Sequence, residues 1–146
     1  MRTFTTFQTT LFNSTEVRNY FINDCCFGDD CAAWLAGELR ATGLAGVGDP
    51  WQEDWGWQFA VELGDSRILL GVGLIPEDEP EWLIQIQESR SLLKRWLGQP
   101  DREGMRRVVQ TVHAVLSHAR ELRSVRWHQA EEFERGQSEG APTPEA

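Results

Sequence analysis

Apolar and polar residues alternate along the middle of the chain, in three consecutive segments. Residues 57–63, 68–74 and 82–86 each place apolar side chains at every second position. This period is typical of strands that bury one face, and the Gly-Asp pair between the first two segments is a common turn sequence. We therefore predict a three-stranded antiparallel meander, with an acidic loop over residues 76–80.

Two longer segments carry apolar residues at helical spacing instead. The first is predicted to begin at Asp29 or Asp30 and to run to about Thr42, where Gly43 supplies a left-handed stop. The second runs from about residue 101 to 122. Its apolar stripe comprises Met105, Val108, Val109, Val112, Val115, Leu116, Ala119 and Leu122.

Shorter elements are predicted at both ends of the chain. Residues 3–12 are rich in β-branched and aromatic side chains, which favours a strand, and Val125 with Trp127 indicates a closing edge strand. Short helices are predicted over residues 17–21, capped by Asn13, and over residues 91–97.

In the remaining segments the apolar residues follow neither the strand nor the helix period. Residues 44–56 contain several glycines and an Asp-Pro pair, which predicts a loop. Residues 129–146 are dominated by Glu, Gly, Pro, Gln and Ser, which predicts a disordered acidic tail. Together the elements predict a single α+β domain over residues 1–128, a two-layer sandwich with an antiparallel sheet and helices on one face.

Composition narrows the class of protein. The chain has 146 residues, of which 40% are hydrophobic and 25% charged, and its net charge is -9. A phosphate-tracking nucleic-acid binder needs a basic face, and a membrane span needs about 18 consecutive apolar residues. The amino-terminal residues also lack the apolar core of a signal peptide. We expect a cytoplasmic protein that binds neither nucleic acid nor membrane.

Charge is unevenly distributed along the chain. The net charge is -8 over residues 1–100, +3 over residues 101–128 and -4 over residues 129–146. We expect the arginines of the long predicted helix to pair with the acidic loops or the tail. One alternative is that these arginines form a docking surface for an acidic partner. Another is that the acidic chain as a whole binds a basic partner.

Signatures of catalysis and metal binding are missing. The spacing of Cys25, Cys26 and Cys31 is not that of a metal site. We expect all three cysteines to be buried as small apolar side chains, without a structural disulfide. His113 and His118 are five residues apart and do not share a helix face as a metal pair would. Nucleophile elbows, zinc motifs and phosphate-binding loops are also missing, which predicts no catalytic residue, cofactor or metal.

The most unusual string is Trp51-Gln-Glu-Asp-Trp-Gly-Trp57. Two adjacent carboxylates among three indoles could form a pocket for a cation, or hold a general acid in an apolar setting. The alternative is that the acids are solvated loop residues and the indoles are anchors. The candidate binding residues are Trp51, Glu53, Asp54, Trp55 and Trp57.

Four strings resemble those of a set of small bacterial α+β proteins with no known activity. They are Leu11-Phe12-Asn13, Phe27-Gly28-Asp29-Asp30, Glu53-Asp54-Trp55-Gly56-Trp57 and Glu81-Trp82-Leu83-Ile84. This resemblance covers about residues 11–128 and implies a bacterial, cytoplasmic setting. The order of elements is also similar, at the level of fold, to type III secretion chaperones and toxin-immunity proteins. The long predicted helix precedes the last strand, which departs from the chaperone pattern.

Three functions follow from these observations, in decreasing order of support. The first is a non-enzymatic protein-interaction module that binds another protein, or a second copy as a homodimer, through the open sheet face or the acidic loops over residues 49–54 and 76–81. The second is a small-ligand-binding protein or hydrolase centred on residues 51–57. The third is a mimic of nucleic acid, in which acidic side chains imitate phosphates.

Overall fold

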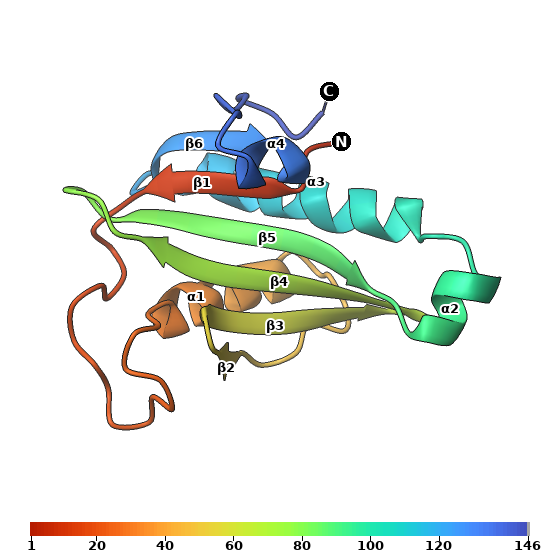
Figure 1. The fold of residues 1–146 in the computed structure, drawn as a ribbon, viewed down its shortest axis with the longest axis horizontal. Coiled ribbons are helices and arrows are strands. Elements are labelled where there is room, and N and C mark those ends of the chain that lie inside the picture. Colours follow the sequence, from red (N-terminus) through yellow and green to blue (C-terminus); the bar gives the residue numbers. More distant parts are fainter. Residues whose placement is uncertain (146) are drawn as a thin grey trace.

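The computed structural model describes residues 1–145, and an antiparallel sheet of six strands forms its centre. The strands are β1 (Phe4–Gln8), β2 (Trp51–Glu53), β3 (Gly56–Leu63), β4 (Ser66–Ile75), β5 (Glu81–Ser89) and β6 (Arg123–His128), in the spatial order β2-β3-β4-β5-β1-β6. The first strand therefore lies inside the sheet, between β5 and β6 (Figure 1). The α+β class and the antiparallel sheet are as predicted.

Two helices cover one face of this sheet, α1 (Asp29–Ala41) and α3 (Arg102–His118) (Figure 1). Their apolar stripes face the inward side chains of the strands and form one core. The largest buried core side chains are Phe7, Leu35, Leu39, Phe59, Leu70, Trp82, Ile84, Ile86, Leu116 and Trp127. Burial of so many large apolar groups is the main favourable contribution to folding.

The predicted meander is present as β3, β4 and β5, with the inward residues in register. Phe59 pairs with Leu70, and Leu70 pairs with Ile86 on the next strand. The predicted loop 44–56 differs, because its last part forms the short strand β2 and turns back at Asp54 and Trp55. The composition of this segment predicts a loop. Residues 51–53 form a strand because hydrogen bonds to β3 stabilise the extended backbone.

The helix predicted over residues 17–21 is absent from the structure, where this stretch is irregular. The Asn13 side chain does cap a turn, because its Oδ1 accepts hydrogen bonds from the backbone N–H groups of Thr15 and Glu16. An Asn side chain accepts such hydrogen bonds in turns as well as at the start of helices. Asn13 is therefore a cap, as predicted, but it caps a turn.

The ends of the helices are set by capping residues. At α1 the cap is Gly28 rather than Asp29 or Asp30, and Gly43 has φ +87°, the left-handed stop that the sequence predicts. The short helix α2 (Leu92–Leu97) begins at Ser91, whose hydroxyl accepts from the Lys94 N–H. The cap of α3 is Asp101, which accepts from the Gly104 N–H at 2.8 Å.

The segment after β6 folds back onto the sheet, whereas the sequence predicts a disordered tail over residues 129–146. It contains α4 (Ala130–Glu134), which lies on the face opposite to α1 and α3 (Figure 1), so the helices do not all cover one face. The Phe133 ring packs edge-on against Phe4 with centroids 5.9 Å apart. Ala141 pairs with Trp127, and Ala146 lies outside the described residues.

Candidate functional site

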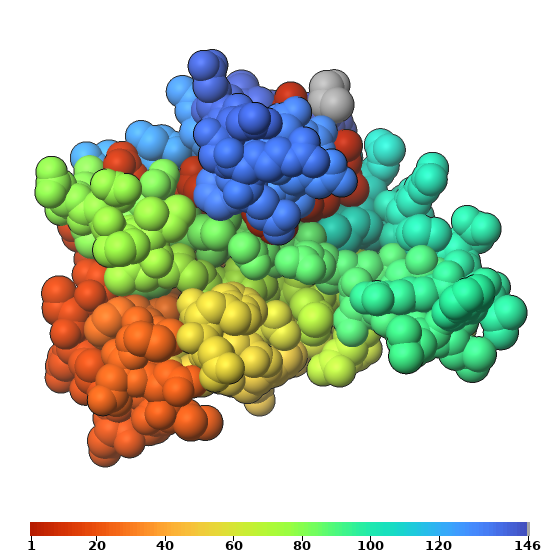
Figure 2. Space-filling model, viewed as in Figure 1, coloured from red at the N-terminus to blue at the C-terminus, as the bar shows by residue number. Residues whose placement is uncertain are grey.

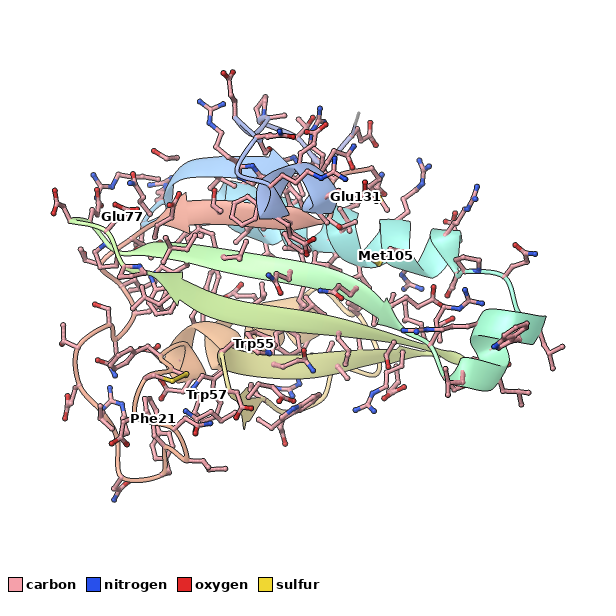
Figure 3. All side chains as sticks on the ribbon, in the orientation of Figure 1. Phe21, Trp55, Trp57, Glu77, Met105 and Glu131 are labelled. Atoms are coloured by element: carbon pink, nitrogen blue, oxygen red, sulfur yellow. A yellow bond between two sulfur atoms is a disulfide. The ribbon has the colours of Figure 1, made fainter. Side chains whose placement is uncertain are left out.

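The β2–β3 hairpin holds all five predicted binding residues, but their side chains lie on two faces of the sheet. Trp51 pairs with Gln58, which points away from the helices, whereas Trp57 belongs to the helix-covered core. Figure 3 shows Trp55 in front of the sheet and Trp57 beside Phe21, at the lower edge. The single pocket predicted for these residues is therefore not formed.

Trp51 and Glu53 lie on the open face and contact each other. The indole N–H of Trp51 donates to Glu53 Oε1 at 2.8 Å, and the Arg67 guanidinium lies 5.8 Å from the centre of the Trp51 ring. Arg67 also pairs with Glu62 at 3.0 Å. The Trp51 hydrogen bond occupies one oxygen of the Glu53 carboxylate, which favours a structural role for it. Arg67 contacts Trp51 and Glu62 instead of Glu53.

Trp55 lies across the open face and is 48% exposed. Its ring rests on Gly71 so closely that a Cβ on Gly71 would meet the ring at 2.4 Å. Two hollows of about 250 Å³ flank the ring, and both include Gln85 in their lining. The hollow toward β3 also includes Gln58 and Gln87, so amide groups surround the exposed indole.

Trp57 and Gln52 anchor the irregular loop that precedes α1. The Trp57 indole N–H donates to the Cys26 carbonyl at 2.9 Å. The Gln52 amide donates to the Asn23 carbonyl at 2.8 Å and accepts from the N–H groups of Asn23 and Ile22. Sequence reasoning missed Gln52, because its role depends on contacts with a loop 29 and 30 residues away.

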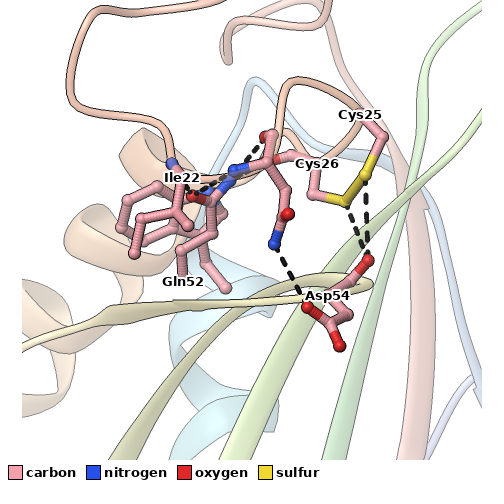
Figure 4. The surroundings of a disulfide bond; sticks show 7 residues. Ile22, Cys25, Cys26, Gln52 and Asp54 are labelled. Atoms are coloured by element: carbon pink, nitrogen blue, oxygen red, sulfur yellow. Dashed lines mark hydrogen bonds between the residues drawn. A yellow bond between two sulfur atoms is a disulfide. The ribbon is translucent and has the colours of Figure 1, made fainter.

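Cys25 and Cys26 form a disulfide in this loop, contrary to the expectation of three free, buried cysteines (Figure 4). Cys25 is exposed and Cys26 buried, and their sulfur atoms lie 3.7 Å and 3.1 Å from the Asp54 carbonyl oxygen. Cys31 is free and fully buried in the core, as expected. Burial raises the pKa of the Cys31 thiol well above its ordinary value, and the charges of Asp30 and Asp29 add to this.

Tyr20 and Asp29 form a polar pair beside the same loop. The Tyr20 hydroxyl donates to Asp29 Oδ2, and the Arg18 guanidinium lies 3.8 Å from that oxygen. The hydrogen bond to Asp29 raises the pKa of Tyr20, with desolvation and the negative charge of Asp29 adding to it. Asp29 stands in the first turn of α1, where a negative charge is stabilised by the helix dipole, so the pair ties the loop to the helix.

Four of the five most exposed large apolar side chains lie on α2, and the fifth is Ile22. Leu92, Leu93, Trp96 and Leu97 are between 69% and 86% exposed. Lys94 Nζ donates to the Asp65 carbonyl, so a polar contact holds α2 to the β3–β4 turn while its apolar side chains face outward. In Figure 2 this segment projects at one end of the molecule, opposite the loop that precedes α1.

Basic side chains concentrate around these apolar groups. Residues 90–107 carry six basic and two acidic side chains, a net charge of +4 in a chain whose total is -9. Of the arginines in residues 101–128, Arg123 pairs with Glu79 of the acidic loop, as expected. Within the described residues the three arginines on α3, Arg102, Arg106 and Arg107, form no ion pair. We call residues 90–107 the basic–apolar segment.

A groove of about 500 Å³ lies between α1 and α3, away from the basic–apolar segment. It is open to solvent and mixes apolar, acidic and histidine side chains. Its lining includes Trp34, Glu38, Val115, His118 and Glu121.

Within residues 1–145, His, Cys, Asp and Glu side chains form no group of three or more that could hold a metal ion. Each helix of this part is too short or too polar to cross a bilayer. Comparison of the chain with protein-family models, with curated proteins and with solved structures gives no match. The resemblance to small bacterial proteins therefore stays a prediction.

Proposed function

We propose that this chain is a non-enzymatic protein-interaction module, of the kind that immunity proteins and secretion chaperones represent. The observation that carries the proposal is the exposure of four large apolar side chains on α2. Scattered apolar residues are normal on protein surfaces, but a contiguous group that includes Trp and is flanked by Arg has the composition of a binding hot spot.

The charge of the basic–apolar segment supports an acidic partner protein. Exposed Lys94 and Arg95 alternate with the apolar side chains, and Arg102, Arg106 and Arg107 continue the positive surface along α3. An acidic protein surface with an apolar pocket complements this arrangement, and opposite charge speeds the encounter and sets specificity. A second copy of the chain is the competing occupant, since its α1–α3 groove contains Glu38 and Glu121.

Site-specific photo-crosslinking in the native cell tests this assignment. A photoreactive phenylalanine analogue replaces Trp96, which is 86% exposed, or Ile22, which is 82% exposed on the loop at the other end of the molecule. We expect one abundant protein adduct from position 96 and none from position 22. Charge reversal at the exposed Arg95 and Arg102, which leaves the Lys94 contact with Asp65 in place, should reduce that adduct about tenfold, because the partner is acidic.

Four outcomes would contradict the assignment of an acidic partner protein. Equal adducts at both positions would show non-specific contact. Adducts with nucleic acid or lipid alone would assign the segment to a different class of target. An adduct that survives charge reversal unchanged would exclude the acidic partner. An adduct with twice the mass of the chain would identify the second copy instead.

A small-ligand-binding protein is the second candidate function, and the open face around Trp55 favours it. Exposed indole and three glutamine amides around a hollow of about 250 Å³ suit a neutral ligand that stacks on an aromatic ring and forms hydrogen bonds. Trp55→Ala should remove such binding, measured as a small mass retained in a native mass spectrum. Trp96→Ala is the control, because Trp96 lies outside that hollow.

A further inference from the structure

The disulfide between Cys25 and Cys26 lies where a small molecule or a protein thiol can reach one of its two sulfurs. Cys25 is exposed, whereas Cys26 is 6% exposed. An incoming thiolate therefore has access to Cys25 Sγ, and Cys26 is the leaving group. Cys31 is fully buried in the core and takes no part in the bond.

The loop that carries the disulfide is joined to the β2–β3 hairpin by side-chain contacts on both sides of the cysteines. Gln52 Nε2 donates to the carbonyls of Asn23 and Cys26 at 2.8 Å and 3.3 Å, and Trp57 donates to the Cys26 carbonyl at 2.9 Å. Asn23 Nδ2 donates to Asp54 Oδ1 at 3.2 Å. A change at Cys26 is therefore transmitted directly to the hairpin.

The sulfur atoms themselves face the turn of that hairpin. Both point at the carbonyl oxygen of Asp54, as Figure 4 shows, with Cys26 Sγ at 3.1 Å. A disulfide has no proton, so this oxygen receives no hydrogen bond from sulfur while the bond is intact. A reduced Cys26 thiol could donate one, since S–H is a weak donor. The next residue after Asp54 is Trp55.

We propose that Cys25 and Cys26 form a redox modification site, which interconverts between disulfide and dithiol and adjusts the turn that carries Trp55. In the reductive direction a thiolate of an external dithiol attacks Cys25 Sγ, the bond between the cysteines breaks, and Cys26 leaves as a thiolate that takes up a proton. The reductant is now joined to Cys25 through a mixed disulfide. Its second thiol, as a thiolate, attacks the reductant sulfur of that bond, and Cys25 leaves as a thiolate that takes up a proton.

The exchange is balanced in electrons and protons. Two electrons and two protons pass to the protein, and the external dithiol becomes a disulfide. Reoxidation is the same exchange in reverse, with a disulfide as the oxidant. Disulfides in reducing compartments are usually transient and redox-sensing, so this site is compatible with the cytoplasmic location expected from the sequence. The chemistry does not depend on the function proposed above.

Counting free thiols tests the modification itself. The full chain is treated with reduced dithiothreitol or with its oxidised form, denatured, alkylated with N-ethylmaleimide and weighed intact. We expect three labels after reduction and one after oxidation, and the remaining label should be absent from Cys31→Ser. Three labels after oxidation would overturn the proposal. One label after reduction of the folded protein would also overturn it, because the bond would then be permanent.

The link to the hairpin is tested by the indole N–H signals of the seven tryptophans in two-dimensional NMR. Replacing one Trp at a time by Phe assigns each signal. We expect reduction to shift the signals of Trp55 and Trp57 and to leave Trp96 and Trp82 unchanged, and Cys25→Ser should show the shifted positions without reductant. Unchanged signals, or equal shifts of all seven, would overturn the coupling to Trp55.

Discussion

The seven tryptophans serve different purposes, which their burial separates. Trp82 and Trp127 are fully buried and Trp57 is 8% exposed, so these three fill the core between sheet and helices. Trp55 and Trp96 are exposed and lie in the two surfaces that carry the proposals. Residue type alone could not separate these groups, because an indole suits a core and an interface equally well.

Gly71→Ala tests the position of Trp55. The added methyl group would lie 2.4 Å from the indole, so either the ring leaves the sheet or the strand moves, and we expect a loss of about 1–3 kcal/mol in the free energy of unfolding. Gly73→Ala is the control, because its Cβ would approach the Trp55 carbonyl oxygen at 3.7 Å, an ordinary contact. Urea unfolding measures both, and equal stabilities would contradict this position of the ring.

His128 makes the folded protein sensitive to acid. Its Nε2 lies 3.0 Å from the Thr6 hydroxyl and its Nδ1 lies 2.8 Å from the Ser138 hydroxyl, an arrangement that a neutral ring satisfies with one donor and one acceptor. Burial lowers the pKa of His128 below its ordinary value of 6.5, and the charges of Arg126 and Arg2 lower it further.

Because the unfolded chain binds this proton more readily than the folded chain, stability is full above pH 6.5 and falls as the pH drops from 6.5 toward the folded-state pKa. His128→Gln should remove that part of the pH dependence in urea unfolding. His118→Gln is the control, since His118 is exposed on α3. A pH dependence that remains in His128→Gln and disappears in His118→Gln would contradict the assignment.

At the level of elements, the sequence predicted the strands and helices whose apolar residues follow a regular period. The alternation in β3, β4 and β5 and the stripes of α1 and α3 follow from the burial of one face, and the structure confirms them. Two features were not predicted. Strand β2 pairs with β3 across a two-residue turn, but the glycines and the Asp-Pro pair of residues 44–56 favoured a loop. Helix α4 depends on a distant partner, Phe4, which is 129 residues before Phe133. A single aromatic residue in a polar segment is too weak a signal to predict docking.

The same reason explains the outcome for the candidate site. The Trp-rich string was correctly identified as unusual, but whether its side chains converge depends on strand pairing, which places successive residues on opposite faces. The exposure of α2 was also invisible in the sequence, because its apolar residues have the spacing of a helix that packs against a core.

Phe133→Ala tests the docking of α4. The ring contacts Phe4 and His128, with centroids 5.9 Å and 4.9 Å apart, and its loss should cost about 1–2 kcal/mol and release the segment that follows. We expect faster hydrogen exchange at Trp127 and Ala141, whose backbones pair, without change in β4. Glu132→Ala, on the exposed side of α4, is the control. Unchanged exchange at Ala141 would show that Phe133 does not hold the segment.

For the whole molecule, the basic–apolar segment lies at one end and the disulfide loop at the other (Figure 1). The rest of the chain is acidic overall, although Arg120, Arg123 and Arg126 also carry positive charge, so the surface proposed for docking has the opposite sign to the molecule as a whole. This polarity would orient an acidic partner before contact, because complementary charges act over about 8 Å in physiological salt. The apolar side chains of α2 would then supply most of the affinity.

A native mass spectrum of the protein isolated from its own cells tests the central claim most directly, with Leu93→Ser/Trp96→Ser as the comparison. The account predicts a stoichiometric complex with an acidic protein for the natural sequence and the bare chain for the variant. The variant should unfold within about 0.5 kcal/mol of the natural protein, because both side chains are exposed. The bare chain in both samples, or a retained small molecule in place of a protein, would contradict the interaction module.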